Sequence, residues 1–466
     1  MVTPTCQACG DRDQVIAALQ QQVADLQLQV RDLQARLGTN ASNSSLPPSA
    51  NPPGAPKPVQ KKPTGRKRGA QPKHPPKNRL RLPPERLQHV IPLVPTACAR
   101  CHQPLPAQAG PDDPPPTWHQ VAELPRTAAV VTEFQGHYRT CPCCAHLNHH
   151  PIPADLKADA FGPRLAATLA YLRGSQHVST RGLEEITETL FDVPVSLGTV
   201  GTLAEEVSQA LAPAHAQAQQ AVQQAPLKNV DETSWKLGGQ LCWLWTAVTA
   251  TVACFVVHAC RGLAGLQALL GETILGLVGS DRWSAYHALP PSQRQLCWAH
   301  LKRDFQKCVD RGGPAQAVGE AGLAIVEAVF ERWHRFRGGG LTREELKEAL
   351  KPLVQSLREL LRLGRACADA KVARFCANVQ KLELAVWQFA VVEGMEPTNN
   401  AAERALRRGV LWRKRSFGSQ SVGGCRLVER LLTVVGTLRL QRKPVLPYLV
   451  EAVCAHRAGL PIPNLI

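Results

Sequence analysis

The spacing of apolar residues divides the chain into segments of different period. In residues 12–38 they recur every three or four positions, at Ile16, Leu19, Val23, Leu26, Val30, Leu33 and Leu37. This spacing predicts one helix, and β-branched residues at one core position with Leu at the other favour a parallel two-stranded coiled coil. A helix that packs on its own chain is the alternative. We expect the segment to join copies of the chain as a homodimer or higher oligomer.

From residue 226 the pattern changes to that of strands. PLKNVDETSWK (226–236) is a short apolar approach to Asp231, and LGLVGSDRWSAY (275–286) predicts a buried strand of Leu275, Leu277 and Val278 that ends at Asp281. Residues 241–260 carry no formal charge and have about the length of a membrane helix. Their β-branched residues and polar middle instead favour a two-stranded hairpin beside the Asp231 strand.

The order of the elements predicts the fold class. After the hairpin come a helix near 263–271, the Asp281 strand and a short strand before Cys297, which is the order of a ribonuclease-H-like fold. Residues 160–226 have the lengths and turn of a helix-turn-helix, with Ser196 as the N-cap of the second helix, or of helices that merely pack. Residues 314–395 have a helical pattern, with a break at Gly338–Gly340.

We therefore predict an α/β protein with a ribonuclease-H-like catalytic core and a helical insertion. An N-terminal coiled coil, a zinc-ribbon-like module and a helical, helix-turn-helix-like region precede this core. The expected segments are a coiled-coil helix (1–38), a disordered basic linker (39–88), a zinc-binding ribbon-like domain (89–155), a helical DNA-binding region (156–225), the first part of the core (226–312), the helical insertion (313–396), and the core completion with the Glu403 helix and C-terminal helices (397–466).

The charge balance favours nucleic acid as a partner. The 466 residues contain 54 Lys plus Arg against 37 Asp plus Glu, a net charge of +17, and neutralised phosphates release counterions on binding. No basic amphipathic helix with an aromatic face suggests a membrane surface, and no signal peptide begins the sequence, so we expect an intracellular protein. The linker cations Lys61, Lys62, Arg66, Lys67 and Arg68 predict an arm that follows DNA phosphates; a solubilising tail is the alternative.

Two CxxC pairs predict a structural zinc site. Cys98 and Cys101 form one pair and Cys141 and Cys144 the other, and each pair can present two thiolates to zinc. Cys143 or His146 is an alternative ligand. CARCH also matches a haem-attachment pattern, but that use requires export.

Three acids predict a magnesium site. Asp231 and Asp281 follow strands and Glu403 lies in the helix of TNNAAERALRR, and carboxylates of this kind can hold two divalent ions that clamp a phosphodiester. Thr398–Asn400 offer N-cap groups to that helix, and Asn400, Glu403 and Arg407 share one face. We expect its later cations to bind DNA; a surface salt-bridged helix is the alternative. These cations are Arg404, Arg407, Arg408, Arg413, Lys414 and Arg415.

CWAHLKRDFQK (297–307) adds two auxiliary candidates. Cys297 and His300 share a helix face, but two ligands are too few for a metal site. We predict that His300 positions a phosphate or orients a carboxylate; a packed histidine is the alternative.

DETSW, SDRWSAY, CWAHLKRDF and TNNAAERALRR together resemble the transposases of the insertion sequence 66 family, of the TnpC type. NASNSSLPPS, GRKRGAQPKH, RKRSFGSQSVGG and PVLPYLVEAV extend the resemblance along the chain. It implies a DDE triad of Asp231, Asp281 and Glu403 with magnesium, recognition of the inverted repeats at the element's ends, and in many relatives two small accessory proteins. The implied location is the bacterial cytoplasm, with the DNA of the nucleoid.

The resulting hypothesis is a DNA transposase. Two magnesium ions held by the triad would activate a water that cuts the transposon end, and then the 3′ hydroxyl that attacks target DNA. One alternative is a non-catalytic DNA-binding regulator with an inactive ribonuclease-H-like core. A second is a structure-selective nuclease on the same fold, which would cut without joining.

Overall fold

The computed structural model describes residues 21–23, 25–27, 30, 81–125 and 127–466. The chain forms two compact units, Met1–Ala55 with Ala128–Ile466, and Pro56–Thr127. The described residues between 21 and 30 are helical, and the pairing of two such helices stays a prediction. Lys61, Lys62, Arg66, Lys67 and Arg68 lie outside the described residues.

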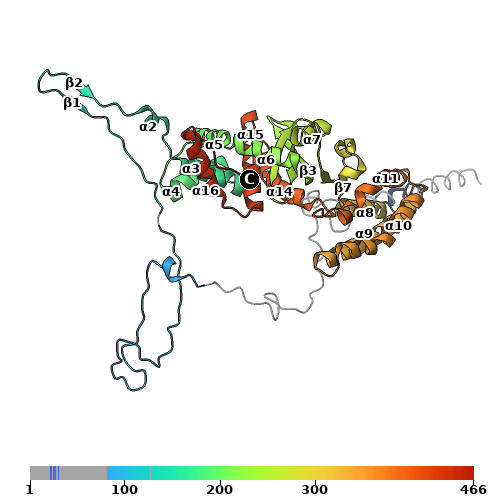
Figure 1. The fold of residues 1–466 in the computed structure, drawn as a ribbon, viewed down its shortest axis with the longest axis horizontal. Coiled ribbons are helices and arrows are strands. Elements are labelled where there is room, and N and C mark those ends of the chain that lie inside the picture. The colour runs from blue at the N-terminus through green and yellow to red at the C-terminus, as the bar shows by residue number, and fades with distance from the viewer. Residues whose placement is uncertain (1–20, 24, 28–29, 31–80, 126) are drawn as a thin grey trace, which may run out of the picture. The chain divides into compact units, whose positions relative to one another are not determined.

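A five-stranded mixed sheet forms the centre of the larger unit (Figure 1). Its strands are β3 (Leu227–Leu237), β4 (Gln240–Val248), β5 (Ala253–His258), β6 (Leu277–Ser280) and β7 (Arg294–Leu296), in the order β5-β4-β3-β6-β7. β3, β4 and β5 are antiparallel, whereas β6 and β7 run parallel to β3. The hairpin predicted for 241–258 is confirmed, and no helix in the described part of the chain is long and apolar enough to span a membrane.

Helices cover both faces of the sheet. Gly409 of α14 (Asn400–Ser416) lies where a Cβ would come 2.4 Å from Leu244, and Gly265 of α7 (Leu263–Leu270) lies where a Cβ would come 2.4 Å from the Trp245 indole nitrogen. Because Leu244 and Trp245 are consecutive in β4, their side chains point to opposite faces. α14 and α7 therefore pack on opposite sides of the sheet, close enough to require glycine.

Helix α15 (Val422–Leu440) covers the outer edge of β5 with side chains in place of another strand. The residues of α15 that contact β5 recur at every fourth position, which is a rise of about 6 Å along the helix. Two residues of a strand span a similar length, so these side chains meet every second N–H group of β5. The N–H groups of Val257, Phe255 and Ala253 donate to Glu429, Thr433 and Thr437, at 2.7, 3.0 and 3.1 Å. This ladder satisfies an edge that would otherwise be open to another chain.

Further helices before and after the sheet complete its surroundings. They are α3 (Pro163–Gln176), α4 (Thr180–Phe191), α5 (Leu197–Ala210), α6 (Ala212–Gln224), α8 (Trp298–Arg311) and α16 (Val445–Arg457). Ser196 accepts from the N–H of Thr199, so the predicted N-cap of α5 is confirmed. The use of α4 and α5 for reading bases stays a prediction.

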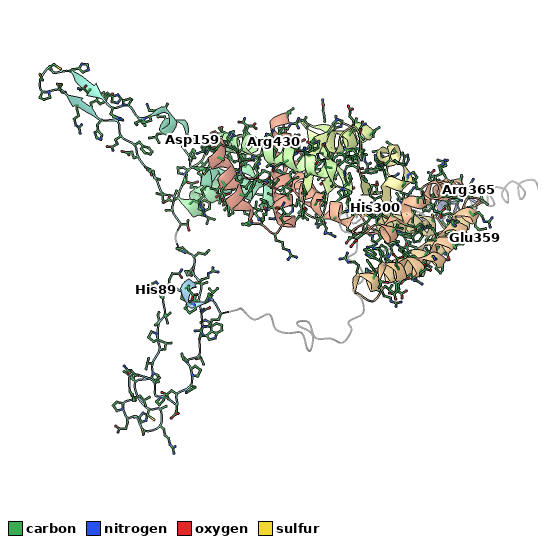
Figure 2. All side chains as sticks on the ribbon, in the orientation of Figure 1. His89, Asp159, His300, Glu359, Arg365 and Arg430 are labelled. Atoms are coloured by element: carbon green, nitrogen blue, oxygen red, sulfur yellow. The ribbon has the colours of Figure 1, made fainter. Side chains whose placement is uncertain are left out.

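The insertion between the last strand and α14 packs around a second hydrophobic core, which it shares with Leu277 of β6, Leu296 of β7 and the buried face of α8. It contains α9 (Pro314–Arg337), α10 (Arg343–Gly364), α11 (Ala370–Lys381), α12 (Glu383–Val386) and α13 (Gln388–Val391). The predicted break at Gly338–Gly340 separates α9 from α10, which begins with a capping box of Thr342 and Glu345. Glu359 and Arg365, labelled in Figure 2, belong to this part of the chain.

Short elements account for the rest. They are η2 (Pro84–Arg86), β1 (Tyr138–Thr140), β2 (Leu147–His149), α2 (Ala154–Ala158), η3 (Ser284–Ala288) and η4 (Pro291–Gln293). Strand β1 is only three residues long, and Val130 and Val131, which precede it, are exposed. Leu275 is also exposed, because the Asp281 strand begins only at Leu277.

Candidate active site

Asp231 lies on the central strand of the sheet, on the face that α14 covers. It pairs in register with Thr246, and Glu232 pairs with Trp245, so the two consecutive acids point to opposite faces. The Asp231 Oδ1 accepts the N–H of Glu232 at 3.0 Å. Burial, followed by the charges of Glu232, Asp281 and Glu403, raises the pKa of Asp231 well above its usual range.

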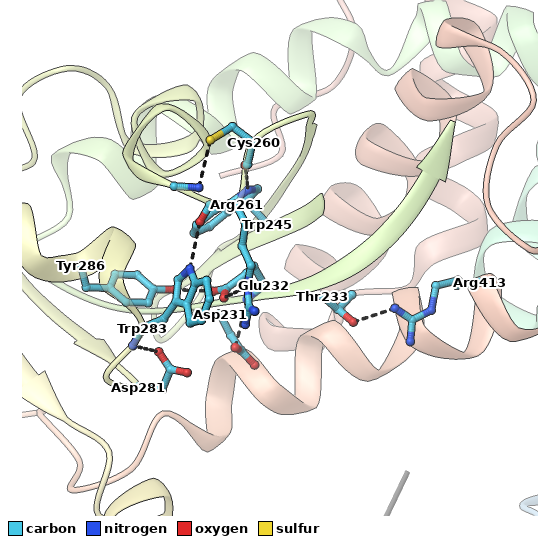
Figure 3. Close-up of polar contacts among 11 residues, drawn as sticks. Asp231, Glu232, Thr233, Trp245, Cys260, Arg261, Asp281, Trp283, Tyr286 and Arg413 are labelled. Carbon is cyan, nitrogen blue, oxygen red and sulfur yellow. Dashed lines mark hydrogen bonds and ion pairs between the residues drawn. The ribbon is translucent and has the colours of Figure 1, made fainter. Parts of the chain in front are cut away.

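Asp281 follows β6 directly and lies beside Asp231. The parallel β3–β6 register pairs Asn229 with Gly279, and two residues further along each strand are the two aspartates. The N–H of Trp283 donates to the Asp281 Oδ1 at 2.8 Å, as Figure 3 shows. Parallel strands thus place two carboxylates side by side.

Glu403 reaches the same region from the first turn of α14, which packs on β3 and β4 (Figure 1). Its Oε1 lies 3.7 Å from the His300 Nδ1 and 3.5 Å from an Arg303 nitrogen. That oxygen is buried and has no hydrogen-bond partner among the described residues. Three carboxylates far apart in the sequence therefore influence one another, which is the convergence that the triad prediction needs.

The N-terminus of α14 differs from its prediction. Asn399 occupies the N-cap position, but no side chain caps the helix. Asn399 is 1% exposed, and its side-chain oxygen and nitrogen lack hydrogen-bond partners among the described residues. The backbone carbonyl of Asn399 instead accepts the N–H of Glu403 at 3.2 Å.

His300 lies in the first turn of α8 and is labelled in Figure 2. A guanidinium can only donate, so the contact of 2.8 Å from Arg303 to the His300 Nε2 makes that nitrogen an acceptor. A neutral imidazole then carries its proton on Nδ1, which lies beside Glu403. At 3.7 Å the His300 Nδ1 and the Glu403 Oε1 form no hydrogen bond, so the role of His300 in orienting a carboxylate stays a prediction.

Cys297 brings a third possible ligand to this cluster. Ligand atoms of Cys297, His300 and Glu403 all lie within 4.8 Å of one another. Burial raises the pKa of the Cys297 thiol to about 11, and the Arg303 contact places a proton on the His300 nitrogen nearest Glu403. Cys297, His300 and Glu403 thus form one compact cluster of possible ligand atoms.

A network that the sequence reasoning missed lies on the opposite face of β3 (Figure 3). The Glu232 carboxylate accepts from Tyr286 Oη at 2.7 Å and from Arg261 Nε at 3.0 Å. The Arg261 guanidinium lies 3.7 Å from the centre of the Trp283 ring, and the Trp283 indole donates to the Arg261 carbonyl at 3.1 Å. Because the N–H of Trp283 also donates to Asp281, the network connects Glu232 on this face of β3 with Asp281.

The cations of α14 divide into two groups. Arg404, Arg407, Lys414 and Arg415 are exposed, and Arg408 is half-buried. Arg413 instead turns toward β3, where it donates to the Thr233 hydroxyl at 3.0 Å (Figure 3), and burial lowers its pKa. Arg413 thus joins α14 to β3, whereas binding of DNA by the exposed cations stays a prediction.

Each CxxC pair forms the same kind of turn. His102 donates its N–H to the Cys98 carbonyl and Ala145 to the Cys141 carbonyl, both at 2.9 Å, and His102 and Ala145 both have left-handed backbones. Backbone N–H groups within the turns lower the pKa of both Cys98 and Cys141. Each turn thus favours thiolates, as a zinc ligand requires. The two pairs belong to different units, and their sharing of one zinc ion stays a prediction.

Acids gathered on a mixed sheet, beside a helix with exposed cations, define a candidate site for phosphoryl transfer on nucleic acid. A family model described as "Transposase IS66 family" matches residues 159–427. This match covers more than half of the chain, so the chain belongs to the IS66 transposase family, and the matched domain supports a transposase role. A second model, described as a family of unknown function, matches residues 2–80.

Two similar proteins come from Sinorhizobium fredii (strain NBRC 101917 / NGR234), and both are named as uncharacterized. Protein y4qI is 27% identical over 200 residues, which is 40% of this chain and 37% of the relative. Protein y4hP is 24% identical over 420 residues, which is 81% of this chain and 73% of the relative. The chain thus spans well under half of the first relative and most of the second.

Proposed function

We propose that this protein is a DNA transposase that binds the inverted-repeat ends of an insertion sequence, cuts a DNA strand and joins it to target DNA. It would act as a polynucleotidyl transferase through Asp231, Asp281 and Glu403. The observation that carries this proposal is the convergence of the three acids, with the raised pKa of Asp231 as its electrostatic consequence. Such uncompensated negative charge is suited to divalent cations.

The residues present fit magnesium. All three side chains offer hard carboxylate oxygens, and the buried Glu403 Oε1 has no hydrogen-bond partner among the described residues. When bound, two magnesium ions would supply charge stabilisation at phosphorus and activation of the attacking oxygen. Asp231, Asp281 and Glu403 would hold these two ions.

Other residues of the chain would position these groups. Arg303 fixes the proton of His300 on the side of Glu403, and Arg294 donates to the Asp281 carbonyl at 3.1 Å. The exposed cations of α14 would bind DNA phosphates on either side of the reacting one. This division of roles explains why basic residues follow Glu403 along one helix.

The sheet supports a ribonuclease-H-like core. A central strand paired antiparallel with a hairpin on one side and parallel with two further strands on the other is the arrangement expected of that fold. The helices before the sheet, the CxxC turns and the N-terminal helix would serve DNA binding, structural zinc binding and dimerisation. Accessory proteins belong to the same proposal through the family resemblance.

Cleavage of end-labelled inverted-repeat DNA tests the proposal. Purified full-length protein is incubated with Mg²⁺ and the labelled end, with and without target DNA, and products are separated on a denaturing gel. We expect wild type to nick and join, and Asp231→Asn to bind DNA without cutting it. Glu331→Gln, an acid-to-amide change on the exposed side of α9, is the matched control and should retain both steps.

The possible outcomes separate the alternatives. Equal binding by wild type and Asp231→Asn, with no cleavage by either, would favour the DNA-binding regulator. Cleavage without joining would favour the nuclease. Cleavage that survives Asp231→Asn would refute the triad.

A further inference from the structure

Phe417 is a large apolar side chain that the fold leaves in solvent. It is 77% exposed and forms the C-cap of α14, with a left-handed φ of 58°. Glycine and asparagine adopt this backbone far more readily than an aromatic residue. Neither burial nor local conformation accounts for phenylalanine here, so its side chain points to a partner.

The loop that carries Phe417 is fixed to the end of the β3–β4 hairpin. Ser419 donates its N–H to the Lys236 carbonyl at 2.8 Å, and Gly238 donates to the Ser419 carbonyl at 2.9 Å. A Cβ on Gly418 would come 2.4 Å from the Lys236 oxygen, so only glycine permits this approach. Phe417 is therefore presented on an anchored loop, and little conformational freedom would be lost when a ligand covers it.

The surroundings of Phe417 identify the chemistry of that partner. Exposed residues follow one another along α14 at helical spacing, and all but one are cations. They are Arg404, Arg407, Leu411, Lys414 and Arg415. A helix face with cations at this spacing, ending in an exposed aromatic ring, matches a nucleic acid strand, in which phosphates alternate with flat bases.

The helix also gives the distance to the proposed catalytic acids. Phe417 follows Glu403 by 14 residues, which is about 21 Å of helix. DNA rises about 3.4 Å per base pair, so this length corresponds to about six base pairs.

We propose that Phe417 stacks on a base of the bound transposon end, about six base pairs from the phosphate at Asp231, Asp281 and Glu403. The proposal rests on the proposed function and specifies how the DNA is held. Exposed cations of α14 bind the phosphates, and the ring of Phe417 packs on one base that is unstacked from its neighbour. Stacking of this kind is tolerant of sequence and fixes the register of the strand.

An abasic scan combined with Phe417→Ala tests this proposal. Full-length protein is titrated, without divalent metal, into fluorescent end DNA with single abasic sites placed two to ten base pairs from the cleaved phosphate. We expect Phe417→Ala to weaken binding of intact DNA about ten-fold. One abasic position near the sixth base pair should weaken wild type to a similar degree and leave Phe417→Ala unaffected. Phe417→Trp should bind as tightly as wild type.

Two variants separate stacking from general effects. Val422→Ala removes another apolar side chain, 62% exposed and five residues away, and should bind as wild type does. Phe417→Leu keeps apolar bulk without an aromatic face and should behave as Phe417→Ala. Thermal melting of each variant should match wild type, because the side chain is in solvent.

Three results would overturn the proposal. They are equal losses for wild type and Phe417→Ala at every abasic position, wild-type binding by Phe417→Leu, and a change of oligomeric state in Phe417→Ala without DNA. The last would assign Phe417 to a contact between copies of the chain. Coupling between Phe417 and one base in a protein that cuts no DNA would support stacking and count against only the catalytic proposal.

Discussion

Asp231 and Glu232 are consecutive acids in one strand, and their surroundings differ completely. Glu232 is buried with partners for both oxygens, Tyr286 at 2.7 Å and Arg261 at 3.0 Å. Burial raises the pKa of both acids, but Tyr286 and Arg261 act against the shift at Glu232. At Asp231 the neighbouring charges of Glu232, Asp281 and Glu403 add to it.

The comparison distinguishes Glu232, whose charge is balanced within the protein, from Asp231, whose charge would be balanced by a bound cation. A buried carboxylate with a cation and a hydroxyl is satisfied by its own protein, whereas one among other carboxylates is destabilised until a cation arrives. Under the proposed function, one face of β3 would support the site and the opposite face would bind the cations. Variants at Asp231 should therefore affect activity most, whereas variants at Glu232 should affect stability most.

The largest expected effect is the loss of cleavage in Asp231→Asn. Removing this carboxylate should lower the cleavage rate at least about a thousand-fold, because several kcal/mol of transition-state stabilisation would be lost. The same change should raise the melting temperature of metal-free protein, since it removes repulsion among the acids. Single-turnover cleavage and thermal melting measure the two effects.

Glu232→Gln is the matched comparison one residue away. It should destabilise the protein by on the order of 1–3 kcal/mol, because the buried contact with Arg261 loses its charge. Cleavage should fall much less than in Asp231→Asn. Equal losses of activity with no difference in stability would contradict the division between the two faces.

The second-largest expected effect concerns His300, which lies beside Glu403 and is proposed to orient it. His300→Ala removes the donor beside Glu403 and should lower activity about ten- to a hundred-fold, as losses of metal-ligand supports usually do. The concentration of Mg²⁺ at half-maximal activity should rise, a change that a packing defect alone would not cause. His300→Asn, which keeps a donor near the Nδ1 position, should restore part of the activity.

Lys302→Gln provides the control for that prediction. Lys302 lies exposed on the same helix, next to Arg303 in sequence. The Lys302→Gln variant should need the same Mg²⁺ concentration as wild type. If His300→Ala also needs the same concentration, His300 does not orient Glu403.

The sequence predicts the strands well because their signals are local. β-branched residues define the hairpin, and Asp231 and Asp281 each follow a recognisable strand. The partners of Glu232 lie 29 and 54 residues further along the chain, and no local period pairs Arg261 and Tyr286 with it. Tyr286 and Trp283 nevertheless both lie in the SDRWSAY motif. A buried acid at position 232 needs hydrogen-bond donors, and this requirement could have directed attention to that motif.

The start of α14 and the position of Arg413 differ from what their residue types suggest, and the physical cause is the same. Thr398–Asn400 have the residue types of a cap, and Arg413 has the residue type of a DNA contact. In the folded chain no side chain caps α14, and Arg413 donates into β3. Tertiary packing decided both, because each residue lies where α14 meets another element rather than open solvent.

A smaller effect is the stabilisation of the folded protein by magnesium. Binding to the native acids alone should raise stability by about 2.7 kcal/mol at a hundred times the dissociation constant. We expect the melting temperature of wild type to rise by a few degrees when Mg²⁺ is added. The rise in melting temperature should be largely absent in Asp231→Asn and retained in Glu232→Gln. The reverse pattern would place the cation on the face of β3 that carries Glu232 and would contradict the proposal.

The last prediction concerns what burial does to a charge in this strand, away from the proposed site. Lys228 is 1% exposed, and its ammonium donates to the carbonyls of Gln223 and Leu275 at 2.9 and 3.0 Å. Burial lowers its pKa from 10.5 to about 8. A lysine with a lowered folded pKa disfavours folding while it is charged, so this cost is complete below pH 8 and disappears as the pH rises toward 10.5.

Urea unfolding of wild type and Lys228→Met between pH 7 and pH 10.5 measures this cost. The stability of wild type relative to Lys228→Met should increase steadily across that range, while the difference stays constant below about pH 7. A flat difference would mean that the two carbonyls fully compensate the buried ammonium. Burial of a charge in β3 would then cost little, and the raised pKa of Asp231 would have to come mainly from the neighbouring acids.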